Sequence, residues 1–179
     1  MLLMSGSLKD QPILSLHLGV PVGRAIEPII NPHNLKILGW WCQEKGARGR
    51  SILLAEEVRE RLDRGLAVND ESAFAQPDEL ARHREILDIK FELIGKAVKT
   101  KRSKLGKVSD YAFDSEGLFV QKLYVARSFL KGLSKNALII DRRQIIEITD
   151  DYILVRDTEV KATETEEELA PATEAVPAA

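Results

Sequence analysis

The residues of this chain that could do chemistry on a substrate are three histidines and one cysteine. His17, His33 and His83 fall in a predicted strand, turn and helix, and no two have the four-residue spacing of a helical metal site. Cys42 stands beside two tryptophans, as a buried thiol would, without a neighbouring base or positive charge to activate it. Neither a phosphate-binding glycine loop nor a G-x-S-x-G nucleophile turn is present. The sequence therefore predicts no catalytic residues, no cofactor and no metal site.

The adjacent residues Trp40 and Trp41 are the first candidates for contact with a partner. Neighbouring residues on a strand point to opposite faces of the sheet, so the two indoles cannot both enter one core. We expect one ring in the core and the other covered by the second half of the chain. The alternative is an exposed aromatic ring that binds a partner protein.

Two short basic clusters are the other candidates for partner contact. Basic loops bind phosphate groups, which makes RNA or a ribosome a candidate partner, whereas a solvated hairpin turn explains the same composition. Aromatic residues are not interleaved with either cluster, so no stacking platform for bases is expected. The clusters are Lys45, Arg48 and Arg50 in the first half of the chain, and Lys101, Arg102 and Lys104 in the second.

The elements that must position these residues are short strands, most clearly in the second half. Residues 107–113 alternate polar and apolar, and an acidic turn over 114–117 then reverses the chain. The return strand 118–125 slips in phase between Val120 and Leu123, which indicates a β-bulge.

The strands that follow complete the pattern. The run 137–140 is apolar throughout, so we expect it to be buried on both faces after a loop over 128–136. A final hairpin joins 145–148 to 152–155. Strands this short, linked by tight turns, predict a small antiparallel barrel.

A weaker copy of this pattern occurs in the first half. Gly23 aligns with Gly106 and Leu35 with Leu118, a shift of 83 residues, with a basic and an acidic residue matched between them. Two units of about 75 residues explain the length better than one large domain, although units of that size need mutual packing. We expect a mainly β protein with a first barrel over 8–75, a linker helix within 76–93, a second barrel over 94–157 and a disordered acidic tail over 158–179.

The first unit is predicted in more detail from the same signals. Alternating and apolar runs predict its strands, and charged residues with an apolar stripe predict two helical segments. The expected strands cover 11–18, a segment ending at Ile30, and 35–42; the expected helical turn covers 55–62, a polar linker covers 70–76, and the linker helix begins at Pro77 and ends near Ile89.

The second unit resembles a PRC-barrel domain. The resemblance rests on Gly106-Lys107-Val108, the Asp114 to Gly117 loop, Leu123-Tyr124-Val125 and the run from Ile140 to Ile148. It covers 95–155 well and 12–68 more weakly, so the chain is similar to a stand-alone tandem PRC-barrel protein. The family occurs in the cytoplasmic part of the photosynthetic reaction centre H subunit and in the C-terminal half of the ribosome maturation factor. The resemblance implies tandem barrels and transfers no catalytic residue.

Composition and charge place the chain among ordinary globular proteins. It has 179 residues, of which 44% are hydrophobic and 30% charged, and a formal net charge of −2. Residues 157–179 hold seven acidic residues and one lysine, so the rest of the chain is mildly basic. No apolar run approaches the roughly 18 residues of a membrane span, and one cysteine cannot form an intrachain disulfide. We expect a cytoplasmic protein without membrane insertion.

Three functions are compatible with these patterns. The first is a non-catalytic adaptor whose barrels bind a partner protein during the assembly or regulation of a complex. The alternative is a ribosome-maturation or RNA-associated factor, and the third is a scaffold at the cytoplasmic face of a membrane complex. The expected contact residues are Trp40, Trp41, Lys45, Arg48, Arg50, Lys101, Arg102 and Lys104, and the oligomeric state is left open.

Overall fold

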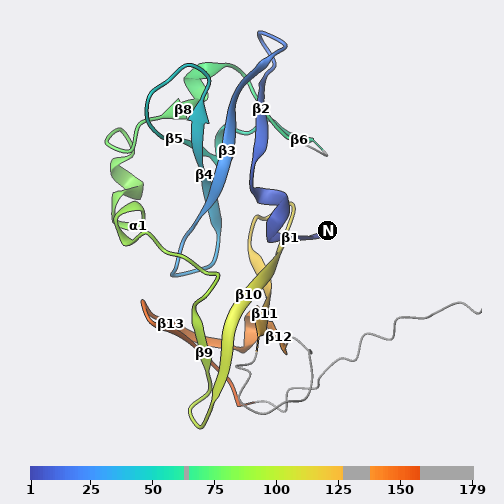
Figure 1. The fold of residues 1–179 in the computed structure, drawn as a ribbon, viewed down its shortest axis with the longest axis vertical. Helices are drawn as coiled ribbons and strands as arrows, with labels where there is room; N and C mark the ends of the chain where they lie inside the picture. The colour runs from blue at the N-terminus through green and yellow to red at the C-terminus, as the bar shows by residue number, and fades with distance from the viewer. Residues whose placement is uncertain (63–64, 127–137, 158–179) are drawn as a thin grey trace, which may run out of the picture.

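The structure, a computed structural model, describes residues 1–62, 65–126 and 138–157 and is mainly β with one short α-helix. Two seven-stranded sheets follow one another along the long axis of the molecule (Figure 1). We call the sheet of β2 to β8 the first unit, and the sheet of β1 and β9 to β14 the second unit. The strands of the first unit are β2 (Gln11–Ser15), β3 (Pro21–Ile30), β4 (Ile37–Glu44), β5 (Ser51–Leu54), β6 (Glu60–Leu62), β7 (Gly65–Val68) and β8 (Phe74–Ala75). Those of the second are β1 (Leu2–Met4), β9 (Ala97–Lys99), β10 (Lys104–Asp114), β11 (Val120–Ala126), β12 (Leu138–Asp141), β13 (Ile145–Ile148) and β14 (Tyr152–Val155).

The two units share one strand order. The first runs β5-β4-β3-β2-β7-β6 and the second β12-β11-β10-β9-β14-β13. The expectation of purely antiparallel sheets is wrong at one ladder in each, because β2–β7 and β9–β14 are parallel. In the first unit the hairpin β6–β7 places β7 beside β2, and in the second the hairpin β13–β14 places β14 beside β9, each pair running in the same direction. Among the described residues, the strands at the two ends of a sheet do not pair with each other. The sheet is therefore a curled half-barrel.

The internal repeat extends to the irregularities of the strands. Ile26 is the extra residue where β3 bulges against β4, and Ser109 is the extra residue at the corresponding point of β10. Leu38 and Gln121 are the extra residues where β4 and β11 bulge in turn. Each pair is related by the same shift in the sequence as Gly23 and Gly106. The bulge predicted after Val120 is therefore confirmed, and it is a repeated feature of both units.

The hairpin turns of the two units meet and exchange backbone hydrogen bonds. The N–H of Ile37 donates to the carbonyl of Leu118 at 2.7 Å, and the N–H of Val120 donates to the carbonyl of Leu35 at 3.0 Å. Because equivalent residues swap roles in the two bonds, a local two-fold axis passes between the turns. Leu35 and Leu118 have φ values of 57° and 56°, a left-handed conformation that leucine rarely adopts. The exchanged bonds hold both residues in it.

One continuous hydrophobic core runs through both units. Its largest fully buried side chains include Trp40 from the first unit and Tyr111 and Phe113 from the second. Leu8 and Leu93, which precede the first strand of each unit, are also buried in it. The expected mutual packing of the halves is therefore present, and the two sheets share one core.

The N-terminal strand β1 belongs to the second sheet. Leu3 pairs with Phe113 in an antiparallel ladder along β10, although the first unit follows β1 directly in the sequence. The predicted first domain began at residue 8 and so left this strand unassigned. The strand is only three residues long, which is too short for a recognisable strand pattern in the sequence.

Strand β12 is buried on one face only, which corrects the prediction for 137–140. Ile140 is 1% exposed, whereas Ile139 is 38% exposed. The reason is that β12 belongs to a curled sheet that packs on the core with one face, so alternate side chains of the strand point to solvent. An unbroken apolar run does not by itself distinguish one-sided from two-sided burial.

The predicted linker helix is much shorter than expected. The α-helix α1 covers Arg84–Ile89, preceded by a 3₁₀ turn over Ala81–His83. The carboxylate of Glu79 accepts a hydrogen bond from the N–H of Gln76, which makes a local turn instead of a helix start. Leu80 then has ψ 57°, outside the helical region. Pro77 therefore lies in a turn rather than in the first turn of the helix.

Two further segments of the first unit differ from their predictions. Residues 55–62 form a 3₁₀ turn over Ala55–Glu57 followed by β6, because β6 pairs with β7 in a hairpin. The linker predicted over 70–76 contains a 3₁₀ turn and β8, which pairs with β5. Strand pairing within the β6–β7 hairpin outweighs local helix preference in the first case. The loop over 128–136 and the acidic tail over 158–179 lie outside the described residues.

The one-sided burial of β12 predicts unequal effects for two neighbouring substitutions. Ile140→Ala should lower the free energy of unfolding by about 2–5 kcal/mol, because it leaves a cavity in the core. Ile139→Ala should lower it by no more than about 1 kcal/mol, since only strand propensity and partial burial are lost. Urea titrations followed by tryptophan fluorescence would measure both. Equal losses would mean that β12 is covered on both faces.

Candidate functional site

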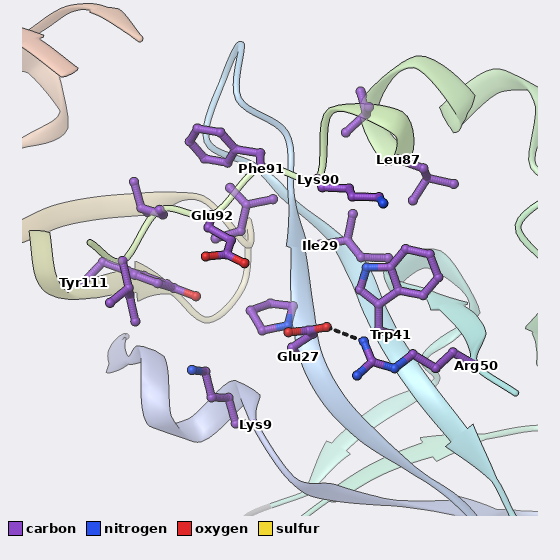
Figure 2. A pocket seen from close by; sticks show the side chains of 15 residues that line it. Lys9, Glu27, Ile29, Trp41, Arg50, Leu87, Lys90, Phe91, Glu92 and Tyr111 are labelled. Carbon is purple, nitrogen blue, oxygen red and sulfur yellow. Dashed lines mark hydrogen bonds and ion pairs between the residues drawn. The ribbon is translucent and has the colours of Figure 1, made fainter. Parts of the chain in front are cut away.

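A cavity of about 650 Å³ lies where the first unit, the linker and the second unit meet. Figure 2 shows side chains from β3, from the linker around α1 and from β10 directed toward it. Trp41, Phe91 and Leu87 supply apolar and aromatic surface, and the hydroxyl of Tyr111 points into the space. A volume of this size, lined by apolar side chains together with several charged ones, can accommodate a ligand or a side chain of a partner. We call it the β3 groove.

The two tryptophans separate as strand alternation predicts. Trp40 is 1% exposed and belongs to the core, so it is removed from the candidate contact residues. Trp41 is half-buried and lines the β3 groove together with Arg50. Trp41 thus faces the side of the molecule where the second unit packs, but a cavity keeps part of its ring accessible.

The groove follows an edge of β3 that no strand of the described residues covers. β2 pairs with β3 only as far as Ala25, and beyond that residue the strand has β4 on one side alone. The equivalent part of β10 is covered, because β1 pairs with it from Ala112 to Asp114. The repeat therefore has one covered edge and one open edge.

On the covered edge, every second backbone N–H donates a hydrogen bond. The N–H of Ser115 donates to the carbonyl of Met1 at 2.8 Å as β1 lies alongside. The N–H of Tyr111 donates at 2.7 Å to the carboxylate of its own neighbour, Asp110. Since hydrogen-bonding direction alternates along a strand, these N–H groups point to the same side of the chain.

On the open edge, two of the equivalent donors do not exist. Pro28 occupies the position of Tyr111, and Pro32 that of Ser115, and proline has no backbone N–H. Of the three residues at these positions, Pro28, Ile30 and Pro32, only Ile30 has a backbone N–H. Prolines on an edge strand prevent another strand from adding to it. The β3 groove is therefore suited to side chains and not to an added β-strand.

The charged groups of the groove are unevenly paired. Arg50 donates to the carboxylate of Glu27 at 2.7 Å, which neutralises both (Figure 2). Lys9 and Lys90 also line the groove, and among the ion pairs of the described residues neither has a carboxylate partner. Glu92 is the remaining acid. The groove therefore presents a small net positive charge around an apolar floor.

The first basic cluster does not act as one surface. All three are exposed, but only Arg50 lines the β3 groove, whereas Lys45 and Arg48 lie on the loop between β4 and β5. That loop is shaped by left-handed conformations at Gly46 and Gly49. Its side chains therefore point to solvent, away from Trp41 and its groove.

The second basic cluster is larger than the sequence indicated. Lys101, Arg102 and Lys104 are exposed on the hairpin that joins β9 to β10, and the pairing of β9 with β14 brings Tyr152 beside them. The ammonium of Lys99 lies 3.3 Å from the centroid of the Tyr152 ring. An aromatic ring therefore lies near this cluster although none is interleaved with it in the sequence, and Lys99 covers one face of that ring. Tyr152 is far from this cluster in the sequence. Its position could have been predicted only by recognising that β14 is the counterpart of β7 in the repeat.

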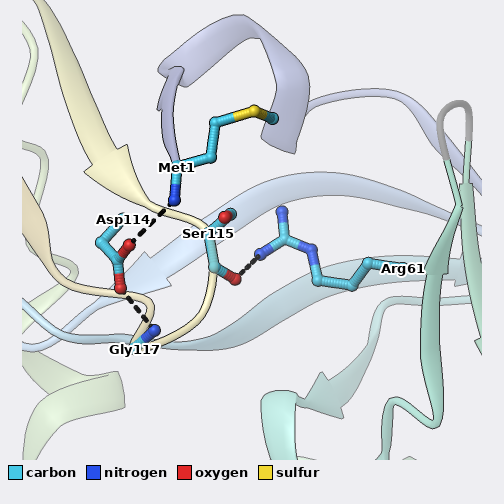
Figure 3. Close-up of polar contacts among 5 residues, drawn as sticks. All are labelled: Met1, Arg61, Asp114, Ser115 and Gly117. Atoms are coloured by element: carbon cyan, nitrogen blue, oxygen red, sulfur yellow. Dashed lines mark hydrogen bonds and ion pairs between the residues drawn. The ribbon is translucent and has the colours of Figure 1, made fainter.

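The acidic turn after β10 has a structural role. Asp114 accepts a hydrogen bond from the N–H of Gly117 at 2.6 Å, which lowers the pKa of its carboxyl group, and the ammonium group of Met1 lies 3.5 Å away (Figure 3). Arg61 from β6 donates to the carbonyl of Ser115 at 3.2 Å. This residue links the first unit to the turn, and desolvation lowers the pKa of its guanidinium group.

The histidines and the cysteine are not assembled into a reactive site. Within the described ranges, no group of three histidine, cysteine or acidic side chains is placed to hold a metal ion. Cys42 is fully buried, and this desolvation raises the pKa of its thiol from 9.0 to about 12. The thiol therefore stays protonated at neutral pH and is a poor nucleophile.

Comparison with known proteins leaves the family of the chain open. No protein-family model matches the sequence, and no curated protein is similar enough to match it. In the parts of the chain that the structure describes, none of the helices has the length and apolar character needed to cross a membrane.

The buried thiol predicts a specific pH dependence of stability. Above about pH 9 the thiol ionises in the unfolded state but not in the folded state, so unfolding is favoured as pH rises toward the folded pKa of about 12. The free energy of unfolding of wild type, relative to Cys42→Ala, should fall by up to about 1.4 kcal/mol per pH unit in this window. Urea titrations at several pH values would measure the difference. Parallel profiles would show that Cys42 is not buried.

Proposed function

We propose that this chain is a cytoplasmic, non-catalytic adaptor built from two PRC-type barrel units. In this proposal a partner protein inserts a side chain into the β3 groove during the assembly or regulation of a complex. The cytoplasmic part of the proposal draws on the lone cysteine, since disulfides are rare in that compartment.

The observation that carries the proposal is the difference between the two edges of the repeat. The β10 edge is closed by β1, and the β3 edge is left open beside a cavity. Packing generally removes cavities from protein interiors, so an open groove between units is a candidate site for a partner. Trp41 at its floor is the type of residue that contributes most to binding energy at interfaces.

The chemistry of the groove defines the partner. Its apolar floor fits an aliphatic or aromatic side chain, and the missing donors at Pro28 and Pro32 disfavour recognition through a strand backbone. The unpaired ammonium groups of Lys9 and Lys90 favour an acidic residue next to that side chain. The expected partner therefore presents an apolar anchor flanked by a carboxylate.

A second candidate function, an RNA-associated factor, is favoured by the basic hairpin between β9 and β10. Only this hairpin supports it, because Arg50 of the first cluster is neutralised by Glu27. The hairpin and the β3 groove have no residue in common, so the two functions are compatible.

Substitution at Trp41 tests the adaptor function. A protein captured from extract of the source cells, and retained after nuclease treatment, would be purified and titrated against the full-length chain. Trp41→Ala should weaken its binding at least about tenfold, because the substitution removes the apolar floor of the groove. Lys90→Glu should weaken it as well, by repelling the expected carboxylate.

Leu18→Ala is the matched control for these variants. Leu18 is 52% exposed on the hairpin between β2 and β3, away from the groove, so the substitution should leave the affinity unchanged. A partner that binds Trp41→Ala as tightly as wild type would contradict the proposed groove. A partner released by nuclease would instead support the RNA-associated function.

A further inference from the structure

The hairpin between β9 and β10 concentrates positive charge at one end of the molecule. Between residues 99 and 107 there are five cations and no acid: Lys99, Lys101, Arg102, Lys104 and Lys107. All but Lys99 are exposed, and Lys99 is half-buried. Beside them lies a hollow of about 730 Å³, lined by three of the lysines and by Tyr152. We call this surface the basic hairpin.

The turn of the basic hairpin is fixed by its own hydrogen bonds. Thr100 is 6% exposed, and its hydroxyl accepts hydrogen bonds from the N–H of Arg102 at 3.2 Å and of Ser103 at 3.1 Å. The N–H of Thr100 donates to the carbonyl of Ser103 at 2.8 Å. The backbone that carries Lys101 and Arg102 is therefore ordered before any ligand arrives, which lowers the entropic cost of binding.

The side chain of Lys99 is also held in place. Its ammonium lies over the ring of Tyr152 at 3.3 Å from the centroid, a cation–π contact. Lys104 and Lys107 line the same hollow as Lys99, so three lysine side chains lie around one space. Asp151 in the hollow and Asp157, which is 3.5 Å from Arg102, only partly offset the five cations.

The first unit provides an internal control for the role of this charge. Its equivalent hairpin, between β2 and β3, carries the exposed apolar side chains Leu16, Leu18 and Val20. The two hairpins occupy equivalent places in the repeat and lie at opposite ends of the molecule (Figure 1). The fold therefore does not require a charged turn at this place, and the cations of the second hairpin call for another explanation.

We propose that the basic hairpin binds the phosphate backbone of a nucleic acid. Several ammonium groups and a guanidinium group on one ordered hairpin match a ligand with successive phosphates. Because Lys99 covers a face of Tyr152, the ring is not free to stack on bases at that face, so binding is independent of base sequence. This site shares no residue with the β3 groove, and either proposal can fail while the other stands.

A nucleic acid fits this surface better than an anionic membrane. Membrane-binding surfaces combine basic residues with apolar side chains that enter the bilayer. The turn from Lys99 to Lys104 contains no apolar residue, and the exposed Leu16 and Leu18 lie at the far end of the molecule. One flat membrane cannot contact both ends at once.

Fluorescence anisotropy with the full-length protein tests the site. The probe is a labelled oligouridylate of about 20 nucleotides, titrated between about 50 and 200 mM salt. If about three phosphates are contacted, the slope of log K against log salt should be about −2. The double variant Lys101→Ala/Arg102→Ala should bind at least about tenfold more weakly, with a slope flatter by about 1.

The matched control is Lys45→Ala/Arg48→Ala, which removes the same two charges from the exposed loop of the first unit. It should bind the probe as wild type does, and both variants should keep the wild-type thermal midpoint because all four side chains are exposed. Equal losses of affinity in the two double variants would show that the effect depends on net charge alone. That result would overturn the site. Lack of binding at the lowest salt would overturn it too. Tighter binding to vesicles with about 30% phosphatidylserine than to the probe would assign the surface to a membrane instead.

Discussion

The structure depends on the two backbone hydrogen bonds that the hairpin turns exchange across the local two-fold axis. Leu35 and Leu118 each accept a bond from the other unit while holding a left-handed conformation that costs about 1 kcal/mol or more. This contact sets the two sheets end to end, joins their cores, and fixes the distance over which the linker must pass. The β3 groove exists because the linker passes that edge without pairing to it.

The repeat was visible in the sequence because the residues that define it are local. Gly23 and Gly106, the bulges and the turn leucines are each specified by a few neighbouring positions, so they appear at a constant shift. The failures share the opposite cause. The one-sided burial of β12, the pairing of β8 with β5 and the late start of α1 depend on tertiary packing, which local periodicity does not encode.

The candidate sites divide in the same way. Strand alternation was enough to separate Trp40 from Trp41, and composition was enough to find the second basic cluster. The place of Tyr152 beside that cluster comes from a parallel pairing between strands far apart in the chain. The open edge of β3 could have been suspected from Pro28 and Pro32, because both positions differ from their counterparts in the repeat.

The pairing of β1 with β10 has a consequence for how the chain folds during synthesis. Met1 and Asp114 are 113 residues apart in the chain, so β1 leaves the ribosome long before its partner strand exists. The first unit can form its own ladders in that interval, but the second sheet cannot be completed until β10 emerges. Residues 2–4 therefore stay unpaired, with their apolar side chains exposed, until β10 has been synthesised.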